Sequence, residues 1–266
     1  NLQVTGSING TILYNMKSYP ILILAYRRTT ELELVLESLA QLNPSVVYFH
    51  LHRAPDEEAQ KDVEAVKKLI LSYKGKKEVM YSKEPLGVRN SMRTALEWIS
   101  SKEEVFFVFE DDIVLKEGSA EKLMAEMQLL EKSGGVLKFG EHRKHGVYWG
   151  WAVDSRTAKK LLEKSILDVP EEDARPHFNS KMHYLGVMEL FRRAIKDIAF
   201  PYAWDDEFSL LTKVLYLNEI LSKEQLTDHI GYESTRVSNN IDMPFGQGTH
   251  VMFRNGVLVP QENEKA

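Results

Sequence analysis

Short apolar runs alternate with amphipathic segments along the first part of the chain. Runs typical of strands, most of them continuous aliphatic or aromatic sequence, occupy residues 19–28, 46–51, 77–84 and 104–115. Segments with apolar residues at helical spacing occupy residues 31–42, 56–74 and 85–101. Because strands and helices alternate, we predict the α/β class, with a mostly parallel sheet flanked by helices.

The pattern loosens beyond residue 115. The elements predicted there are a helix (118–134), an aromatic strand or loop with a helix after it (147–165), a loop or mixed segment (169–184), a helix entered near Trp204, and a semi-ordered active-site segment or tail (226–252). No repeat or low-complexity linker interrupts the chain. We therefore predict one domain with three parts, which are an N-terminal arm with a possible hairpin (1–18), a first half (19–118) and an elaborated C-terminal half (119–266).

Composition narrows the function classes. The 266 residues are 43% hydrophobic, which suits one large domain or two small ones. With 34 basic and 39 acidic residues and no long basic block, we expect no nucleic-acid partner. The absence of Cys excludes disulfides, thiolate zinc sites and a cysteine nucleophile.

The sequence also bears on location. No apolar run reaches the roughly 18 residues of a membrane-spanning helix. We expect a cytoplasmic protein or one peripheral to a membrane, and the secretory lumen stays open as an alternative. Because the chain begins at Asn1, other domains can lie outside it.

Three adjacent acids interrupt the apolar run at 104–115, which resumes at Ile113. Glu110, Asp111 and Asp112 repel one another, and burial would raise their pKa values. A divalent cation relieves both effects, and Mg²⁺ or Mn²⁺ binds one or two carboxylates together with waters and substrate phosphates. The acids therefore indicate a metal site shared with a diphosphate. The alternative is an acidic cap where a strand meets a loop or helix.

The sequence "FVFEDDIVL" resembles the DXD-type metal motif, in its EDD form, of GT-A glycosyltransferases. "PILILAYRRTTELELVLESL" is similar to the first strand and helix of the same enzymes. The resemblance extends over roughly residues 20–240 and is strongest to the inverting β-1,2-N-acetylglucosaminyltransferases of N-glycan branching and to related bacterial glycosyltransferases. It implies a GT-A-like, Rossmann-like fold and metal-dependent inverting transfer of a hexosyl or N-acetylhexosaminyl group. The expected donor is a nucleotide sugar, with UDP as the expected nucleotide, and the acceptor is a hydroxyl of a carbohydrate or glycoconjugate.

This resemblance also implies a donor site in the first half of the domain. The metal, Mn²⁺ or Mg²⁺, would be held chiefly by Asp112, with Asp111 and His229 as further candidates. The predicted donor-binding residues are Arg28, Arg53, Asp56, Arg89, Glu110 and Asp111. Arg53 departs from the family pattern, because an Asp usually ends the second strand there and reads the base or ribose. Asp56 can take the place of that missing Asp only if its loop folds back toward the nucleotide. The identity of the base therefore stays open.

The second half would bind the acceptor and carry the catalytic base. Trp149 and Trp151 flank Gly150, which suits either a sugar platform or a half-buried strand. Trp204 is a further candidate for the sugar pocket. By resemblance, Asp205 is the base that deprotonates the acceptor hydroxyl and Asp206 caps the helix or orients Asp205, although the two roles can be exchanged.

Two rival interpretations remain. A nucleotidyltransferase on a related α/β sheet would usually carry a glycine-rich loop after the first strand, and "AYRRTTEL" has no glycine. A domain that binds nucleotides or carbohydrates without catalysis would show the same motifs.

Overall fold

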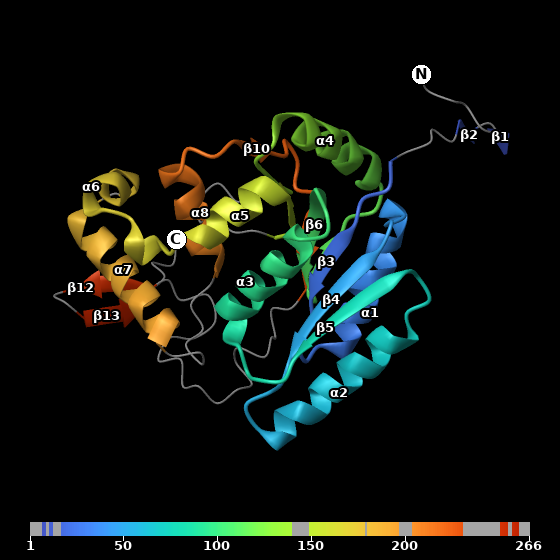
Figure 1. The fold of residues 1–266 in the computed structure, drawn as a ribbon, viewed down its shortest axis with the longest axis horizontal. Helices are drawn as coiled ribbons and strands as arrows, with labels where there is room; N and C mark the ends of the chain where they lie inside the picture. Colours follow the sequence, from blue (N-terminus) through green and yellow to red (C-terminus); the bar gives the residue numbers. More distant parts are fainter. Residues whose placement is uncertain are drawn as a thin grey trace, which may run out of the picture.

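The computed structural model describes residues 7–8, 11–12, 17–139, 149–178, 180–196, 204–230, 251–254 and 257–260. Its centre is a seven-stranded sheet of order β10-β8-β9-β6-β3-β4-β5. Figure 1 labels β10, β6, β3, β4 and β5 of this sheet. The strands in chain order are β3 (Ile21–Leu24), β4 (Val47–His52), β5 (Lys77–Ser82), β6 (Val105–Glu110), β8 (Val136–Lys138), β9 (Trp151–Asp154) and β10 (Glu219–Leu221). The pairings are parallel except that β9 runs against both β6 and β8. The predicted α/β class and mostly parallel sheet are confirmed.

Helices cover both faces of the sheet and divide the core in two. The helices of one face are α1 (Thr29–Leu39), α2 (Glu57–Ser72) and α4 (Ala120–Ser133). Those of the other are α3 (Gly87–Ser100), α5 (Ser155–Glu163), α6 (Glu171–Ala174), α7 (Lys181–Lys196) and α8 (Trp204–Val214). Alternate residues of β3 serve the two cores, because Ile21 and Ile23 join the first and Leu22 and Leu24 the second. A strand buried on both faces requires the continuous apolar run seen in the sequence.

Local sequence explains the helix positions. Helix α2 begins after Asp56, whose side chain accepts a hydrogen bond from the Ala59 N–H and so caps the helix. Val63, Val66 and Ile70 recur at helical spacing and are fully buried against the sheet. The packing of this face positions the loops at the carboxyl ends of the strands.

Smaller elements complete the fold. They are the hairpin strands β1 (Ser7–Ile8) and β2 (Thr11–Ile12), the strands β7 (Ile113–Leu115) and β11 (Thr227–His229), the ribbon of β12 (Val251–Arg254) and β13 (Val257–Pro260), and the short 3₁₀ turns at Ala40–Leu42, Ile166–Asp168 and Arg175–His177. The predicted N-terminal hairpin and the mixed segment at 169–184 are confirmed. The predicted tail at 226–252 is described only as far as Ile230 and again from Val251.

Two predictions need correction. The run at 104–115 is two strands and not one, because the chain turns at Asp111 and Asp112 between β6 and β7. Its second part leaves the main sheet and pairs antiparallel with β11. The short strands β8, β10 and β11 were not predicted, since three residues are too few to show a period.

The strand order places a topological switch beside β3. From β3 the chain moves to β4 and β5 on one side and then returns to β6 on the other. The connections that leave β3 and β6 therefore diverge, and ligands of open parallel sheets bind in the crevice outside such carboxyl ends. None of the helices in the described part of the chain is both long and apolar enough to cross a membrane.

Candidate functional site

Arg28 forms ion pairs with Asp111 and Asp112 at the topological switch between β3 and β6. It lies at the start of α1, after β3, and Asp111 and Asp112 lie in the turn after β6. Its Nη1 is 2.8 Å from Oδ1 of Asp111 and 2.5 Å from Oδ2 of Asp112. The Tyr26 backbone N–H donates to the second oxygen of Asp111 at 2.8 Å. The residues predicted from sequence as a donor arginine and a metal pair are thus in direct contact.

Burial gives these contacts their strength. The side chains of Asp111 and Asp112 are 4% and 3% exposed, and that of Arg28 is 16% exposed. Burial raises the pKa of Asp111 above its ordinary value, against the opposing effect of Arg28. Burial alone would lower the pKa of Arg28, but the nearby carboxylates of Asp111 and Asp112 outweigh it and raise that pKa. Arg28 therefore remains a cation that compensates the buried acids.

Strand β11 brings His229 to the same place. Because β11 pairs with β7, His229 lies opposite Ile113, and its Nε2 is 3.3 Å from Oδ2 of Asp112. The half-buried Trp149 lies against it, with ring centroids 5.4 Å apart. The Thr227 hydroxyl donates to the Trp149 carbonyl at 2.5 Å. His229, which the sequence analysis gave as a candidate metal ligand, thus lies beside Asp112, and Trp149 lies against His229.

Glu110 connects the acidic residues to helix α8. Its Oε1 accepts a 3.0 Å hydrogen bond from Nε1 of Trp204, the first residue of that helix. Asp205 follows Trp204 and is half-buried. For Asp206 the structure describes the backbone in α8 and not the side chain. The sequence expected Glu110 to contact the donor, and its observed partner is a tryptophan.

Arg89, a predicted donor-binding residue, pairs with a different acid, Glu207. Its Nε and Nη2 lie 2.6 and 2.8 Å from the two carboxylate oxygens of Glu207, which is fully buried on α8. Arg93 approaches the same carboxylate at 3.7 Å and donates to the Leu162 carbonyl at the end of α5 at 2.6 Å. Arg89 therefore ties α3 to α8 through a buried ion pair.

The contacts that the structure gives for the remaining predicted residues are to other groups than the acidic pair. The Asp56 carboxylate caps α2, and Arg53 is exposed, with its backbone N–H bound to the Ser82 carbonyl. Trp151 is 1% exposed in the core and stacks on Trp204 at a centroid distance of 5.6 Å. Its ring supports Trp204 from within the protein.

Sequence reasoning missed some residues near the site. Glu207 had a detectable signal, since it follows the Trp-Asp-Asp sequence inside an apolar helix. Lys138 ends β8 and is 7% exposed, and its Nζ lies 3.0 Å from Oε2 of Glu219. Burial lowers its pKa, while Glu219 and Asp205 act in the opposite direction. A lysine inside the apolar run "GGVLKFG" was the available signal.

The residues present suit a cation that is shared with a substrate. Among the described residues, no group of three or more His, Asp or Glu side chains is placed to hold a metal ion. Asp111 and Asp112 nevertheless supply two adjacent carboxylates, already bridged by the positive charge of Arg28. Mg²⁺ and chemically similar ions need only one or two protein carboxylates when waters and phosphate oxygens complete the shell.

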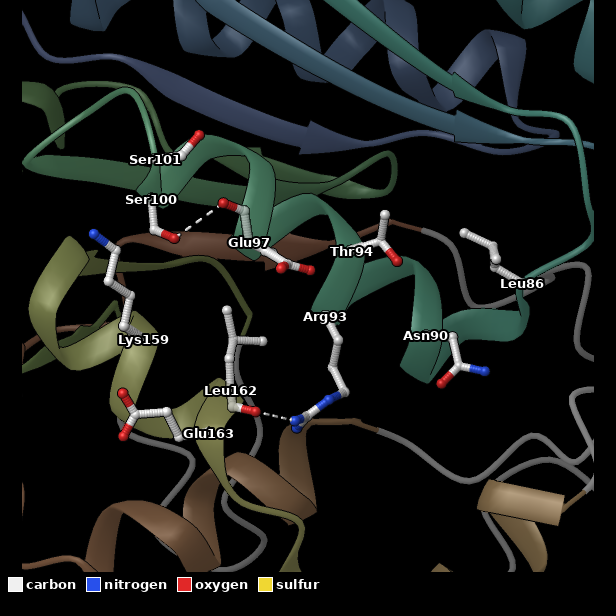
Figure 2. Close-up of a pocket in the computed structure, with 10 residues that line it drawn as sticks. All are labelled: Leu86, Asn90, Arg93, Thr94, Glu97, Ser100, Ser101, Lys159, Leu162 and Glu163. Atoms are coloured by element: carbon white, nitrogen blue, oxygen red, sulfur yellow. Dashed lines mark hydrogen bonds between the residues drawn. The ribbon is translucent and has the colours of Figure 1, made fainter.

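A separate groove of about 700 Å³ lies between α3 and α5 (Figure 2). It extends from Leu86 and Asn90, at the start of α3, to Ser101 at the end of that helix. Arg93 crosses it to reach the Leu162 carbonyl. None of the predicted site residues lines this groove, so we place the candidate site at the Arg28 cluster.

Comparisons with known proteins leave the family open. No protein-family model and no curated protein matches the chain. The chain is similar to the solved structure of a 4-diphosphocytidyl-2C-methyl-D-erythritol synthase from Anaerococcus prevotii, with 9% identity, a TM-score of 0.42 and coverage of 77% of this chain and 88% of that one. It is also similar to a protein assigned as a glucose-1-phosphate thymidylyltransferase from Bacillus anthracis, with 9% identity, a TM-score of 0.39 and coverage of 66% and 84%. Likenesses of this size do not distinguish nucleotidyl transfer from glycosyl transfer.

Proposed function

We propose that the chain is a metal-dependent inverting glycosyltransferase that moves a sugar from a nucleotide-sugar donor, UDP-linked in the first instance, to a hydroxyl of a carbohydrate or glycoconjugate. The observation that carries this proposal is the contact of Arg28 with Asp111 and Asp112 at the topological switch. It gathers a cation and two buried carboxylates where α/β sheets bind ligands. A nucleoside diphosphate bound together with a metal ion needs both, because the carboxylates hold the metal ion and the guanidinium binds the phosphates.

Each part of the cluster has a role in this proposal. Arg28 binds the diphosphate, because a guanidinium matches phosphate oxygens in charge and geometry. Asp112, assisted by Asp111, would hold Mn²⁺ or Mg²⁺, which when bound supplies charge stabilisation to the leaving diphosphate. His229, 3.3 Å from Asp112, is a further ligand or phosphate contact. The donor residues thus come mainly from the proposed donor half, residues 19–118.

The proposed acceptor half, residues 119–266, supplies the base. Asp205 accepts the proton of the acceptor hydroxyl as that oxygen attacks the anomeric carbon and the carbon–phosphate oxygen bond breaks. Its support is its place one residue after Trp204, which is hydrogen-bonded to the acidic cluster. The half-buried Trp149 offers a ring to an apolar sugar face. Trp204 and Trp151 hold this region from the core.

Nucleotidyl transfer on a similar sheet is the competing activity. Such an enzyme binds a triphosphate on backbone N–H groups of a glycine-rich loop. Residues 25–28 link β3 to α1 here and contain no glycine, and the Tyr26 N–H is already bound to Asp111. This arrangement favours a diphosphate held by Arg28.

A product assay tests the proposal. The full chain is incubated with a panel of nucleotide sugars and simple sugar acceptors, and in parallel with nucleoside triphosphates and sugar phosphates. Each mixture contains Mn²⁺ or, separately, EDTA, and the released phosphate compounds are identified. We expect release of a nucleoside diphosphate that depends on the metal. Release of pyrophosphate from a nucleoside triphosphate and a sugar phosphate would assign nucleotidyl transfer instead. Binding of nucleotide sugars without turnover across the panel would assign a binding domain.

A further inference from the structure

Arg28 contacts both buried carboxylates through a single nitrogen atom. Nη1 lies 2.8 Å from Asp111 and 2.5 Å from Asp112. A divalent cation that bridges the two carboxylates through these same oxygens, Oδ1 of Asp111 and Oδ2 of Asp112, would approach the position that Nη1 occupies. The guanidinium and such a cation therefore compete for one position, since two positive charges at this separation repel each other strongly in a buried site.

The same side chain has a donor to spare. Arg28 Nε is buried and has no hydrogen-bond partner among the residues that the structure describes. Buried donors are normally paired, so an orphan of this kind calls for an explanation. The Nε–H lies on the edge of the guanidinium that it shares with Nη2, on the other side from Nη1, and a phosphate group accepts two parallel N–H bonds from such an edge. Arg28 therefore has a donor edge for a second anionic partner besides the nitrogen that contacts the two carboxylates.

We propose that Arg28 makes divalent-cation binding conditional on a diphosphate. In the free protein Arg28 neutralises Asp111 and Asp112. A bound diphosphate attracts the guanidinium to its own oxygens, and the two carboxylates then become available to a divalent cation that also contacts the phosphates. This inference rests on the proposed function, and it adds an order to the binding of its two ligands.

Linkage makes the inference quantitative. If a diphosphate raises the affinity for the cation, the cation must raise the affinity for the diphosphate by the same factor. Coupling between two sites is typically on the order of 5- to 150-fold, and we expect a value in this range. Without Arg28, the cation would no longer compete with a guanidinium. Its affinity in the absence of a diphosphate should then rise, and the coupling should fall toward unity.

A titration with Mn²⁺ tests the conditional binding without any turnover. The electron paramagnetic resonance signal of the free ion measures how much Mn²⁺ is bound. The full chain is titrated with Mn²⁺ alone and with Mn²⁺ in the presence of UDP, GDP, CDP or ADP. Asp112→Asn in the same mixtures gives the background from nucleotides that bind Mn²⁺ in solution. Arg28→Met should bind Mn²⁺ alone more tightly than the wild type. Arg27→Met is the matched control and should behave as the wild type, because Arg27 pairs with the half-exposed Asp62 at 2.7 Å.

The outcomes separate the two proposals. Equal Mn²⁺ affinity of the wild type with and without every nucleotide would overturn the conditional mechanism and leave the proposed function standing. If no Mn²⁺ binding is measurable in the presence of any of the four nucleotides, both the conditional mechanism and the proposed function are overturned. If Arg28→Met does not fold, the wild-type titrations alone decide, since the nucleotide dependence is measured on the unaltered protein.

Discussion

Trp204 and Glu110 join the first turn of helix α8 to the end of strand β6, across 94 residues of sequence, through a 3.0 Å hydrogen bond. Glu110 is next to Asp111, and Trp204 is next to Asp205. The bond therefore couples the position of the proposed base to the position of the acidic pair. The Trp204 ring is also fixed from behind by Trp151 and Phe208, each with a centroid 5.6 Å away.

Trp204→Phe should lower kcat and leave the KM for the donor nearly unchanged. Phenylalanine keeps an aromatic ring in the core but cannot donate to Glu110, so Asp205 loses its positioning contact while the donor site is intact. A misplacement of about 1 Å can cost roughly 100-fold in rate. Steady-state kinetics measure this, with Trp98→Phe on α3 as the matched control. An equal fall in kcat for Trp204→Phe and Trp98→Phe would instead show a general effect of removing an indole.

Glu207→Gln should reduce the free energy of unfolding strongly. The change leaves Arg89 buried without its counter-charge, and breaking a buried pair in this way costs about 3–5 kcal/mol. Urea denaturation measures the loss. Glu189→Gln is the matched control, because Glu189 pairs with Arg192 and Arg193 at 3.5 Å on the surface, where such pairs contribute under about 1 kcal/mol. Similar losses for both variants would refute a structural role for the Arg89–Glu207 pair.

Gly150→Ala should be more destabilising than Gly118→Ala. Both glycines have φ of +74°, so both variants carry the same backbone strain, about 1 kcal/mol. A Cβ on Gly150 would lie 2.8 Å from Phe139 and 3.1 Å from Phe109, whereas nothing lies within 4 Å at Gly118. Overpacking of this kind costs about 1–3 kcal/mol more. Equal unfolding free energies for the two variants would contradict the crowding of a Cβ at Gly150 against Phe139 and Phe109.

His50 should make the protein less stable as the pH falls from about 6.5 to 4. Burial lowers its pKa from 6.5 to about 4, with His52 acting in the same direction. The folded state therefore binds the proton less tightly than the unfolded state, and stability present above pH 6.5 is lost on acidification. The contribution lost at pH 4 is about 3 kcal/mol. Urea denaturation at pH 7 and pH 4 should show a smaller drop for His50→Gln than for the wild type, whereas the exposed His177→Gln should keep the wild-type drop.

The sequence predicted the architecture well because burial leaves a local pattern. Residues 21–24 and 105–109 form continuous apolar runs because both faces of these strands are covered. The reversal of β9 has no such signature, because a strand looks the same in either direction. The pairing between β8 and β10 joins residues that are 83 positions apart in the sequence, in segments of three residues, and no local pattern reveals it.

Side-chain partners were the hardest part of the site to predict. The sequence analysis assigned Arg28 to the donor and Asp111 and Asp112 to the metal, and the structure brings the three side chains together. The local sequence marked Glu207 as an acid inside an apolar helix, but it did not indicate that its partner would be Arg89, 118 residues away. Such pairs depend on how α3 and α8 pack on the sheet.

Asp112→Asn tests the account most directly. The substitution preserves the shape of the side chain and removes one of the two carboxylate charges that we propose bind the cation. We predict that transfer from the nucleotide sugar falls to background at any Mn²⁺ concentration, while circular dichroism shows a folded protein. The control is Asp228→Asn, because Asp228 is on the same strand as His229 but is 54% exposed and pairs with Lys116. Wild-type rates of nucleoside diphosphate release from folded Asp112→Asn would contradict the account.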